Sequence, residues 1–412
     1  MSSNKKVVIT SAARTAVASF MGSLKTEPAE KLYSAVLIEA MKRSNNLDPM
    51  LVESVQCGQV EQSMACNNVA KWSAWDVGCE NAHGMTTNRI CGSGYQAMVS
   101  LWSEIQTGHV EIGIAGGTES LSRANFYFPG EYRFEGFGSN KKKLLDPNEE
   151  AHMNSGPPRL GPPEWMGVTA DRVASLHNIS REDSDRFGYE AQQKNKIANE
   201  QGKFVAEIMP YEVVLRKKSF VFDKDEFGKW DTTMESLAKL KPSFTKDGVV
   251  TAGTATGFND GAAALVMMSE EKCEQLGLEP LAYMSDYVIG VCSPLVMGLA
   301  PGYGIPKLLK KTGLDYDDID LFECNEAFAA QVLGCLRVMD AYPYDGGPNA
   351  DLVYPKLNPY GNGLSMGHPL GATGARIATT ALYQMIDKNY KRSIVTACIG
   401  GGMAVTILLE RP

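Results

Sequence analysis

The stretch NRICGSG, residues 88–94, opens the part of the chain that decides the fold. Apolar residues recur at helical spacing over residues 94–107, and residues 110–115 form a short apolar run that ends at Gly116 and Gly117. The C-terminal part repeats this order. The loop GHPLG at residues 367–371 precedes a helix predicted over 375–388, a strand over 393–399 and glycines at 400 and 401. The parallel predicts two similar halves whose loops meet at one site.

The remaining pattern is that of an α/β protein. Strands are predicted over residues 6–10, 320–324 and 403–409, the last forming a hairpin with 393–399 across Gly400–Gly402, and helices over 29–43, 68–77 and 327–339. Residues 120–248 are aromatic, proline-rich and charged, with one predicted helix over 181–201. We interpret this middle part as an excursion on top of the core.

Composition excludes several classes of protein. With 412 residues, 44% of them hydrophobic, the chain is long enough for two or three structural units. A net charge of −8 argues against nucleic acid or an anionic membrane as the main partner, and no run approaches the length of a membrane-spanning helix. The N-terminus lacks the apolar segment of a secretory signal. Nine scattered cysteines without a CxxC pair predict no metal site and a reducing compartment, the cytoplasm.

Cys91 is a candidate nucleophile. It lies at the start of a predicted helix, where unpaired N–H groups and the helix dipole favour a thiolate, and the flanking glycines let a thioester carbonyl approach the backbone. The alternative is an ordinary buried cysteine.

His368 and Cys398 are the other two candidates. His368 lies in a glycine-rich turn before a helix, which favours a catalytic base over a core histidine, whereas the remaining histidines, including His152, are assigned to surface or structure. Cys398 ends a predicted strand at a three-glycine turn, which presents a thiol beside free N–H groups. The glycine-rich loops match neither a dinucleotide nor a P-loop motif.

Four segments together resemble the thiolase family: NRICGSG at 88–94, NEAF at 325–328, GHPLGATG at 367–374 and CIGGGM at 398–403. The resemblance extends over nearly the whole chain. It implies a five-layered αβαβα core, a first half over 1–120 completed by 251–278, a loop domain over 121–250 and a second half over 279–412. It also implies coenzyme A as co-substrate, no permanently bound cofactor, acyl-CoA substrates and a homodimer or homotetramer; an accessory subunit is not indicated.

The resemblance also assigns roles at the site. Cys91 takes the acyl group, His368 accepts its proton, and Cys398 exchanges a proton with the α-carbon of acetyl-CoA. Asn325 positions a water that forms one oxyanion hole with His368, and the N–H groups of Cys91 and Gly400 form the other. The positions that match family contacts to coenzyme A are Met166, Lys229, Ser236, Phe244, Ala252, Thr256 and Phe328.

Departures from the family pattern bear on the substrate. Trp165 stands where many acetyl-specific members carry histidine, aromatic residues crowd residues 126–137, residues 299–303 make a longer turn, and Asn362 and Ser365 alter the approach to His368. An apolar pocket gains roughly 0.8 kcal/mol for each buried CH₂. We therefore expect a degradative 3-oxoacyl-CoA thiolase that accepts acyl groups larger than acetoacetyl, although these aromatic residues would also suit packing of the loop domain or a subunit interface.

Three alternatives stay open on the sequence. The first is an acetoacetyl-CoA thiolase, that is, an acetyl-CoA C-acetyltransferase. The second is a β-ketoacyl synthase-like condensing enzyme, against which the terminal Cys398 counts. The third is a non-catalytic subunit that binds coenzyme A, which would predict a missing catalytic residue; none is missing.

Overall fold

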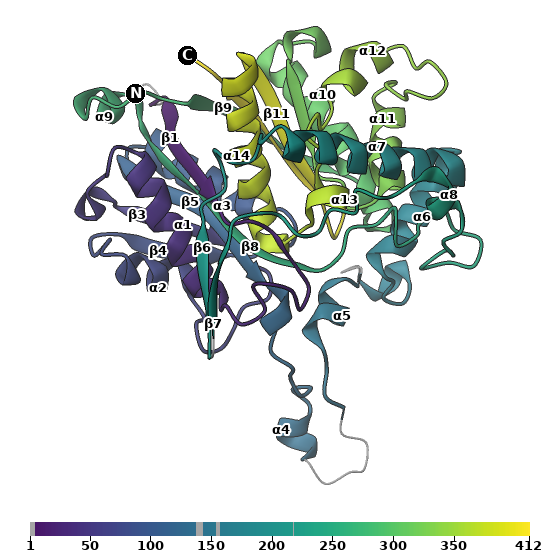
Figure 1. The fold of residues 1–412 in the computed structure, drawn as a ribbon, viewed down its shortest axis with the longest axis horizontal. Helices are drawn as coiled ribbons and strands as arrows, with labels where there is room; N and C mark the ends of the chain where they lie inside the picture. Colours follow the sequence, from purple (N-terminus) through teal and green to yellow (C-terminus); the bar gives the residue numbers. More distant parts are fainter. Residues whose placement is uncertain (1–4, 137–142, 154–156, 217) are drawn as a thin grey trace.

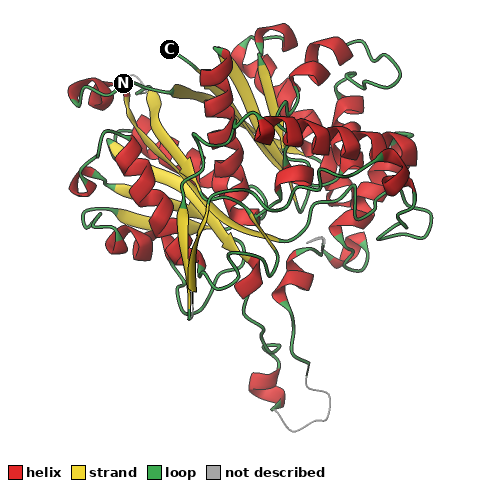
Figure 2. Cartoon of the chain, viewed as in Figure 1, coloured by secondary structure: helices red, strands yellow, loops and turns green. Residues whose placement is uncertain are grey.

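The computed structural model describes residues 5–136, 143–153, 157–216 and 218–412. Most of its strands belong to one mixed sheet (Figure 2), and they are β1 (Val7–Arg14), β2 (Ala18–Ser19), β3 (Ser54–Gly58), β4 (His83–Thr87), β5 (Ile112–Ser120), β8 (Asn259–Ser269), β9 (Ala282–Val291), β10 (Leu321–Cys324), β11 (Arg392–Ile399) and β12 (Met403–Glu410). The hydrogen-bonded order is β10-β11-β12-β9-β1-β8-β5-β3-β4, and β2 pairs with β8. A separate hairpin pairs β6 (Tyr211–Leu215) with β7 (Lys218–Phe222). No helix of the described residues is long and apolar enough to cross a membrane.

The helices pack on the outer faces of this sheet and between its two halves (Figure 1). They are α1 (Ala29–Arg43), α2 (Val69–Asp76), α3 (Ser93–Gln106), α4 (Tyr132–Glu135), α5 (Pro147–Ala151), α6 (Met166–Leu176), α7 (Arg181–Glu200), α8 (Met234–Ala238), α9 (Glu270–Gln275), α10 (Ala300–Thr312), α11 (Ala329–Val338), α12 (Ala350–Val353), α13 (Gly363–Met366) and α14 (Leu370–Lys388).

The sheet consists of two halves with the same connectivity. In the first, β5 lies parallel to β3 and antiparallel to β8, which is antiparallel to β1. In the second, β11 lies parallel to β10 and antiparallel to β12, which is antiparallel to β9. Only Val8 and Ile9 of β1 pair with β9, so a short seam joins the halves. Helix α3 precedes β5 just as α14 precedes β11, which confirms the predicted repeat.

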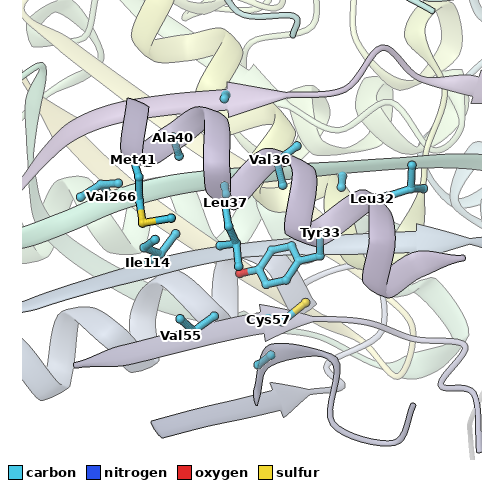
Figure 3. Close-up of a cluster of buried hydrophobic side chains, with 14 of the residues drawn as sticks. Leu32, Tyr33, Val36, Leu37, Ala40, Met41, Val55, Cys57, Ile114 and Val266 are labelled. Atoms are coloured by element: carbon cyan, nitrogen blue, oxygen red, sulfur yellow. The ribbon is translucent and has the colours of Figure 1, made fainter. Parts of the chain in front are cut away.

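Three clusters of buried hydrophobic side chains fill the space between the layers. One lies between α1, α2 and the first half of the sheet, one combines α3 and α14 with the inner faces of both halves, and one lies under α6, α10 and α11. Figure 3 shows the first cluster, where Leu37 and Met41 of α1 pack on Val55 and Ile114. The sequence of helix, sheet, helix, sheet and helix layers confirms the predicted αβαβα class.

Helices α3 and α14 touch through glycines. A Cβ added at Gly94 would lie 2.8 Å from the oxygen of Gly371, and one added at Gly374 would lie 2.4 Å from the nitrogen of Tyr95. No larger residue fits either position without moving backbone. The predicted helix over 375–388 therefore begins too late: α14 starts at Leu370, because tertiary packing outweighs the poor helix propensity of its glycines.

The expected long turn over residues 299–303 is wrong. A 3-10 turn, Pro294–Leu299, leads directly into α10, so Pro301 and Tyr303 lie in the first helical turn. Proline is well placed there because the first N–H groups of a helix have no intrahelical partner.

The middle of the chain packs on both halves and also sends out an arm. Phe222 of β7 belongs to the cluster under α1, whereas Phe187 of α7 belongs to the cluster under α11. Helix α4 lies at the tip of the arm (Figure 1), and Phe126, Phe128 and Phe134 are 61%, 48% and 79% exposed. Phe137 lies outside the described residues. None of the described aromatic residues of this stretch lines the cavity that contains Cys91 and His368, so the expectation that they shape the substrate pocket is wrong for them.

Candidate active site

One cavity collects the candidate catalytic residues from both halves of the fold. It has a volume of about 170 Å³ and opens to solvent. Its lining includes Cys91, His368, Cys398 and Gly400, which come from the loops before α3 and α14, from the end of β11 and from the β11–β12 turn. The rest of the wall is mostly apolar: Ile90, His152, Trp165, Met166, Gly167, Phe244, Thr256, Gly257, Phe258, Met297, Ala327, Phe328 and Leu370. The structure thus brings the two parallel loops together at one site.

The loop that carries Cys91 is held by its own side chains. Asn88 Oδ1 accepts a hydrogen bond from Ile90 N at 2.9 Å, and Ser93 Oγ accepts one from Arg89 N at 2.8 Å. Ile90 has φ 49°, a left-handed conformation that costs a β-branched residue about 1–3 kcal/mol. The left-handed conformation of Ile90 turns the chain sharply just before Cys91. The Cys91 side chain is partly exposed and lines the cavity.

Hydrogen bonds fix the tautomer of His368. The Thr373 hydroxyl donates to the oxygen of Pro369 at 3.0 Å and therefore accepts from His368 Nδ1, which lies 2.6 Å away. The proton thus lies on Nδ1, and Nε2 keeps a free lone pair. That atom is buried and has no partner among the described residues. His368 can accordingly act as a proton acceptor within the cavity.

Burial dominates the protonation states at this site. It raises the pKa of Cys91 to about 12, although the backbone N–H groups of Gly400 and Cys91 act to lower it. Burial, and then the positive charge of Arg376, lowers the pKa of His368 to about 3. Burial thus favours a neutral thiol and a neutral imidazole, and it opposes the thiolate that the helix start favours at Cys91.

Cys398 is the last residue but one of β11, and its thiol is buried. Burial again raises its pKa well above the usual value, with Cys91 the next largest influence. The turn that follows needs glycine: Gly401 and Gly402 both have φ 85°, and a Cβ on Gly402 would lie 2.3 Å from the oxygen of Cys292. This turn holds the N–H of Gly400 close enough to influence the Cys91 thiol.

Asn325 follows β10 and is completely buried, but it is not part of the cavity lining. Neither of its amide atoms, Nδ2 and Oδ1, has a hydrogen-bond partner among the described residues. Buried amides are rarely left unpaired in the absence of a role, and a water or substrate oxygen would satisfy this one.

Buried carboxylates that the sequence reasoning missed position these loops. Glu119 accepts from Val60 N, Glu61 N and Gly371 N at 2.8–3.0 Å, which ties the first half to the start of α14. Glu326 accepts from Asn358 Nδ2 at 2.7 Å and from Asn362 N at 3.1 Å.

The expected influence of Asn362 and Ser365 on the approach to His368 is wrong. Both side chains are completely buried and neither lines the cavity. Asn362 Nδ2 donates to Glu323 at 2.5 Å, and Ser365 Oγ donates to the oxygen of Asn362 at 3.3 Å. Their role is to hold the loop that precedes His368.

Of the seven positions matched to coenzyme A contacts, four line the cavity: Met166, Phe244, Thr256 and Phe328. The other three, Lys229, Ser236 and Ala252, are exposed and lie outside its lining. Ser236 Oγ is already used in the capping box of α8, where it accepts from Thr233 N at 3.0 Å, and it also donates to Thr233 O at 2.8 Å.

His152, which the sequence reasoning assigned to surface or structure, lies in the wall of the cavity. Its position at the C-cap of the short helix α5 left no periodicity or motif by which to find it. Among the described residues, no group of three or more His, Cys, Asp or Glu side chains could hold a metal ion.

Comparison with known proteins agrees with this geometry. The family model "Thiolase, N-terminal domain" matches residues 7–271, and "Thiolase, C-terminal domain" matches residues 278–411. This chain belongs to the thiolase family. It is therefore an acyltransferase, with the thiolase fold.

Relatives of this thiolase match it from end to end. The acetyl-CoA acetyltransferase of Chromobacterium violaceum is 40% identical over 409 residues, covering 99% of this chain and 100% of the relative. The Bacillus anthracis acetyl-CoA acetyltransferase structure has TM-score 0.92 and 36% identity and covers 100% of both chains. The human mitochondrial 3-ketoacyl-CoA thiolase in complex with CoA has TM-score 0.89 and 34% identity, covering 99% of this chain and 98% of that one.

The protonation states predict how Cys91 reacts with iodoacetamide. Because the pKa of Cys91 is about 12 and that of His368 about 3, the thiolate fraction grows about tenfold per pH unit across the neutral range. The alkylation rate, followed by mass spectrometry of the Cys91 peptide, should rise without a plateau between about pH 6 and pH 10. Cys292, the other partly exposed cysteine, is replaced by serine as a control. A plateau that begins below about pH 7 would indicate a thiolate–imidazolium pair and contradict this assignment.

Proposed function

We propose that this thiolase cleaves 3-oxoacyl-CoA with coenzyme A, yielding acetyl-CoA and a shortened acyl-CoA, and that the same site also runs the reverse condensation. The observation that carries the proposal is the single cavity lined by Cys91, His368, Cys398 and the Gly400 turn. A retro-Claisen cleavage needs a nucleophile, a base, a second proton carrier and donors for a developing oxyanion, and these four elements supply one each.

In the first half-reaction, His368 Nε2 takes the proton of the Cys91 thiol as the sulfur attacks the C3 carbonyl. The C2–C3 bond then breaks, the acyl group stays on Cys91, and the acetyl-CoA enolate takes a proton from Cys398. In the second half-reaction, coenzyme A gives its thiol proton to the Cys398 thiolate and attacks the acyl-Cys91 carbonyl. Cys91 leaves and takes back the proton held by His368, which releases acyl-CoA and restores the Cys91 thiol.

Two groups of donors serve the oxyanions of this scheme. The N–H groups of Cys91 and Gly400 both act on the Cys91 thiol, so they converge beside the attacked carbonyl. Loss of one such donor typically costs ~2.7–4 kcal/mol in the transition state. Asn325, with its unpaired amide, positions a water that forms the second hole with His368 Nε2, which donates once it has taken the Cys91 proton.

Coenzyme A enters along the wall that carries Met166, Phe244, Thr256 and Phe328. This assignment draws support from the CoA complex of the human mitochondrial relative. Lys229, Ser236 and Ala252 would contact the outer part of the nucleotide, where exposed positions are suitable. The three-part division at about residues 120, 250 and 278 stays a prediction.

Assembly and location complete the proposal. Strand β4 is one of the two edge strands of the sheet, and Met64, Trp72, Trp75 and Met85 expose apolar surface at 88%, 38%, 56% and 42%. An edge strand with such neighbours suits pairing with a second copy, as in a homodimer or homotetramer. A cytoplasmic location and a degradative role in fatty acid metabolism agree with the free cysteines and with the cleavage reaction.

The acyl-enzyme tests the reaction class. Incubation with a 3-oxoacyl-CoA in the absence of free coenzyme A should leave the acyl mass on the Cys91 peptide, because the second half-reaction then lacks its nucleophile. Cys91→Ala should show no adduct, and His368→Asn should slow adduct formation by about 10²–10⁴-fold through loss of the base. If wild-type protein gives no adduct with any chain length, the proposal fails.

Trp165 supports a substrate larger than acetoacetyl-CoA, because it lines the cavity together with Met297, Phe258 and Leu370. We expect kcat/KM for C6, C8 and aryl-substituted 3-oxoacyl-CoA to equal or exceed that for acetoacetyl-CoA. Trp165→His should shift the preference toward acetoacetyl-CoA, and the exposed, distant Trp75→His serves as the matched control.

An acetoacetyl-CoA thiolase is the second candidate, favoured by the acetyl-CoA acetyltransferase names of the relatives. An advantage of tenfold or more for acetoacetyl-CoA over the longer substrates, about 1.4 kcal/mol, would decide for it.

A further inference from the structure

The connection between α13 and α14 consists of only three residues, Gly367, His368 and Pro369. Because proline has no main-chain N–H, this segment offers two such donors. Gly367 N donates to Gly363 O at 2.9 Å, which ends α13. The N–H of His368 is therefore the one donor through which this segment can be attached to another part of the fold.

Asn259, at the start of β8, accepts that hydrogen bond. Its Oδ1 lies 2.8 Å from His368 N, and its Nδ2 donates to Ala18 O of β2 at 3.0 Å. The side chain is completely buried and is not part of the cavity lining. An asparagine amide has both an acceptor and a donor. The first half of the fold thus fixes the amide, and the amide in turn holds the main chain of His368.

Gly367 packs on the same amide. A Cβ added at Gly367 would lie 2.6–2.7 Å from Cγ, Nδ2 and Oδ1 of Asn259, and the φ of Gly367 is 95°. Neither the space nor the backbone conformation suits any residue but glycine. Asn259 therefore contacts two consecutive residues of the segment, which fixes both its position and its direction.

The nucleophile belongs to the same half as Asn259. Strand β8 pairs with β5, and β5 pairs with β3. A Cβ added at Gly58, the last residue of β3, would lie 2.3 Å from the main chain of Ser93, so the Cys91 loop packs directly on this strand. Groups attached to paired strands are placed more precisely than groups on free loops. The first half can thereby set the position of His368 relative to Cys91, although His368 belongs to the second half.

The Thr373 contact has a different effect. It lies 2.6 Å from His368 Nδ1 and orients the ring, but Thr373 belongs to α14 and follows any shift of that helix. The bond to Asn259 instead ties the main chain of His368 to the sheet that also supports Cys91.

We propose that Asn259 is a positioning residue, whose Oδ1 holds His368 where its Nε2 can take the proton of Cys91. The inference deepens the proposed function and rests on it for the role of His368. The hydrogen bond itself can be tested without turnover.

The first measurement is single-turnover acetylation of Cys91 by acetyl-CoA, followed by quenched-flow mass spectrometry. Asn259→Leu keeps the volume of the amide but neither hydrogen bond. It should lower the maximal rate at least about 100-fold, because a displacement of about 1 Å can cost that much. The half-saturating concentration should stay within about threefold of wild type, because Asn259 lies outside the cavity lining.

Asn259→Asp separates the two hydrogen bonds of the amide. A carboxyl group can accept from His368 N in either protonation state, whereas it can donate to Ala18 O only when protonated. The assay is run at about pH 8, where a negative charge beside His368 leaves its deeply buried ring neutral. Asn259→Asp should acetylate Cys91 within about tenfold of wild type, which a role confined to the Ala18 bond would not allow.

Asn195→Leu is the matched control. Asn195 is also a buried asparagine: its Oδ1 accepts from Trp230 Nε1 at 2.9 Å, and its Nδ2 donates to Tyr360 O at 3.3 Å. Both partners lie outside residues 367–369. This variant loses a comparable pair of hydrogen bonds, but its maximal acetylation rate should stay within about threefold of wild type.

Hydrogen–deuterium exchange of the peptide spanning residues 364–372 is the second measurement. In Asn259→Leu the amide of His368 loses its acceptor, so this peptide should exchange at least about tenfold faster than in wild type. Asn259→Asp and Asn195→Leu should match wild type.

The outcomes separate this inference from the proposed function. If wild-type protein acetylates Cys91 with no acyl-CoA, while exchange rises only in Asn259→Leu, the reaction fails and the attachment of His368 to Asn259 stands. Acetylation by Asn259→Leu within about tenfold of wild type, equal losses in Asn259→Leu and Asn259→Asp, or unchanged exchange in Asn259→Leu would each overturn the inference. If Asn259→Leu does not fold, Asn259→Ala replaces it in both measurements.

Discussion

The close contact between the first turns of α3 and α14 is the constraint on which the site depends. Gly94 and Gly374 allow backbone to meet backbone, and Glu119 adds a hydrogen bond from the first half to Gly371 N. Each helix follows a loop that carries a reactive side chain, Cys91 in one and His368 in the other. Because the helices meet at their N-terminal turns, the two loops open into one cavity. The duplicated architecture thereby yields a single asymmetric site.

The second consequence is electrostatic. Packing both helices inside the molecule buries the reactive groups, and burial favours their neutral forms. His368 is thus an unprotonated base and Cys91 a protonated thiol, so the proton must move during attack. The same dry surroundings strengthen every oriented N–H group that meets an oxyanion. Burial therefore disfavours a preformed thiolate at Cys91, but it strengthens the stabilisation of the oxyanion that develops during the reaction.

Sequence reasoning predicted the repeat because its signals are local. The order of loop, helix, buried strand and paired glycines is visible around Cys91 and again around His368, and the structure confirms the fold that it implies. The same reasoning erred where tertiary contact decides. It began α14 five residues late because glycine propensity opposes a helix that packing on α3 imposes. It did not anticipate that burial opposes a thiolate at Cys91, because the helix dipole can be inferred from sequence, whereas the depth of burial cannot.

The site residues that sequence reasoning missed or placed wrongly are also those whose position depends on tertiary contacts. His152 and Glu119 carry no motif, and only the folded chain brings them to the cavity wall and to the α14 N-terminus. Conversely, Phe126 and Phe134 resembled pocket residues by composition but lie exposed on an arm. Asn362, expected to shape the approach to His368, instead belongs to a buried network with Glu323 and Arg376. Residue type indicated chemistry reliably only where the backbone pattern also indicated position.

The central claim is that the two halves supply separate proton carriers to one nucleophile, and the half-reactions of acetyl-CoA test it most directly. The measurement follows acetylation of Cys91 by mass spectrometry and, in D₂O, deuterium exchange into the acetyl methyl group by NMR. Cys398→Ser should keep acetylation within about tenfold of wild type and lose exchange by at least about 100-fold, whereas His368→Asn should lose acetylation. Equal loss of both reactions in Cys398→Ser would contradict the division of roles.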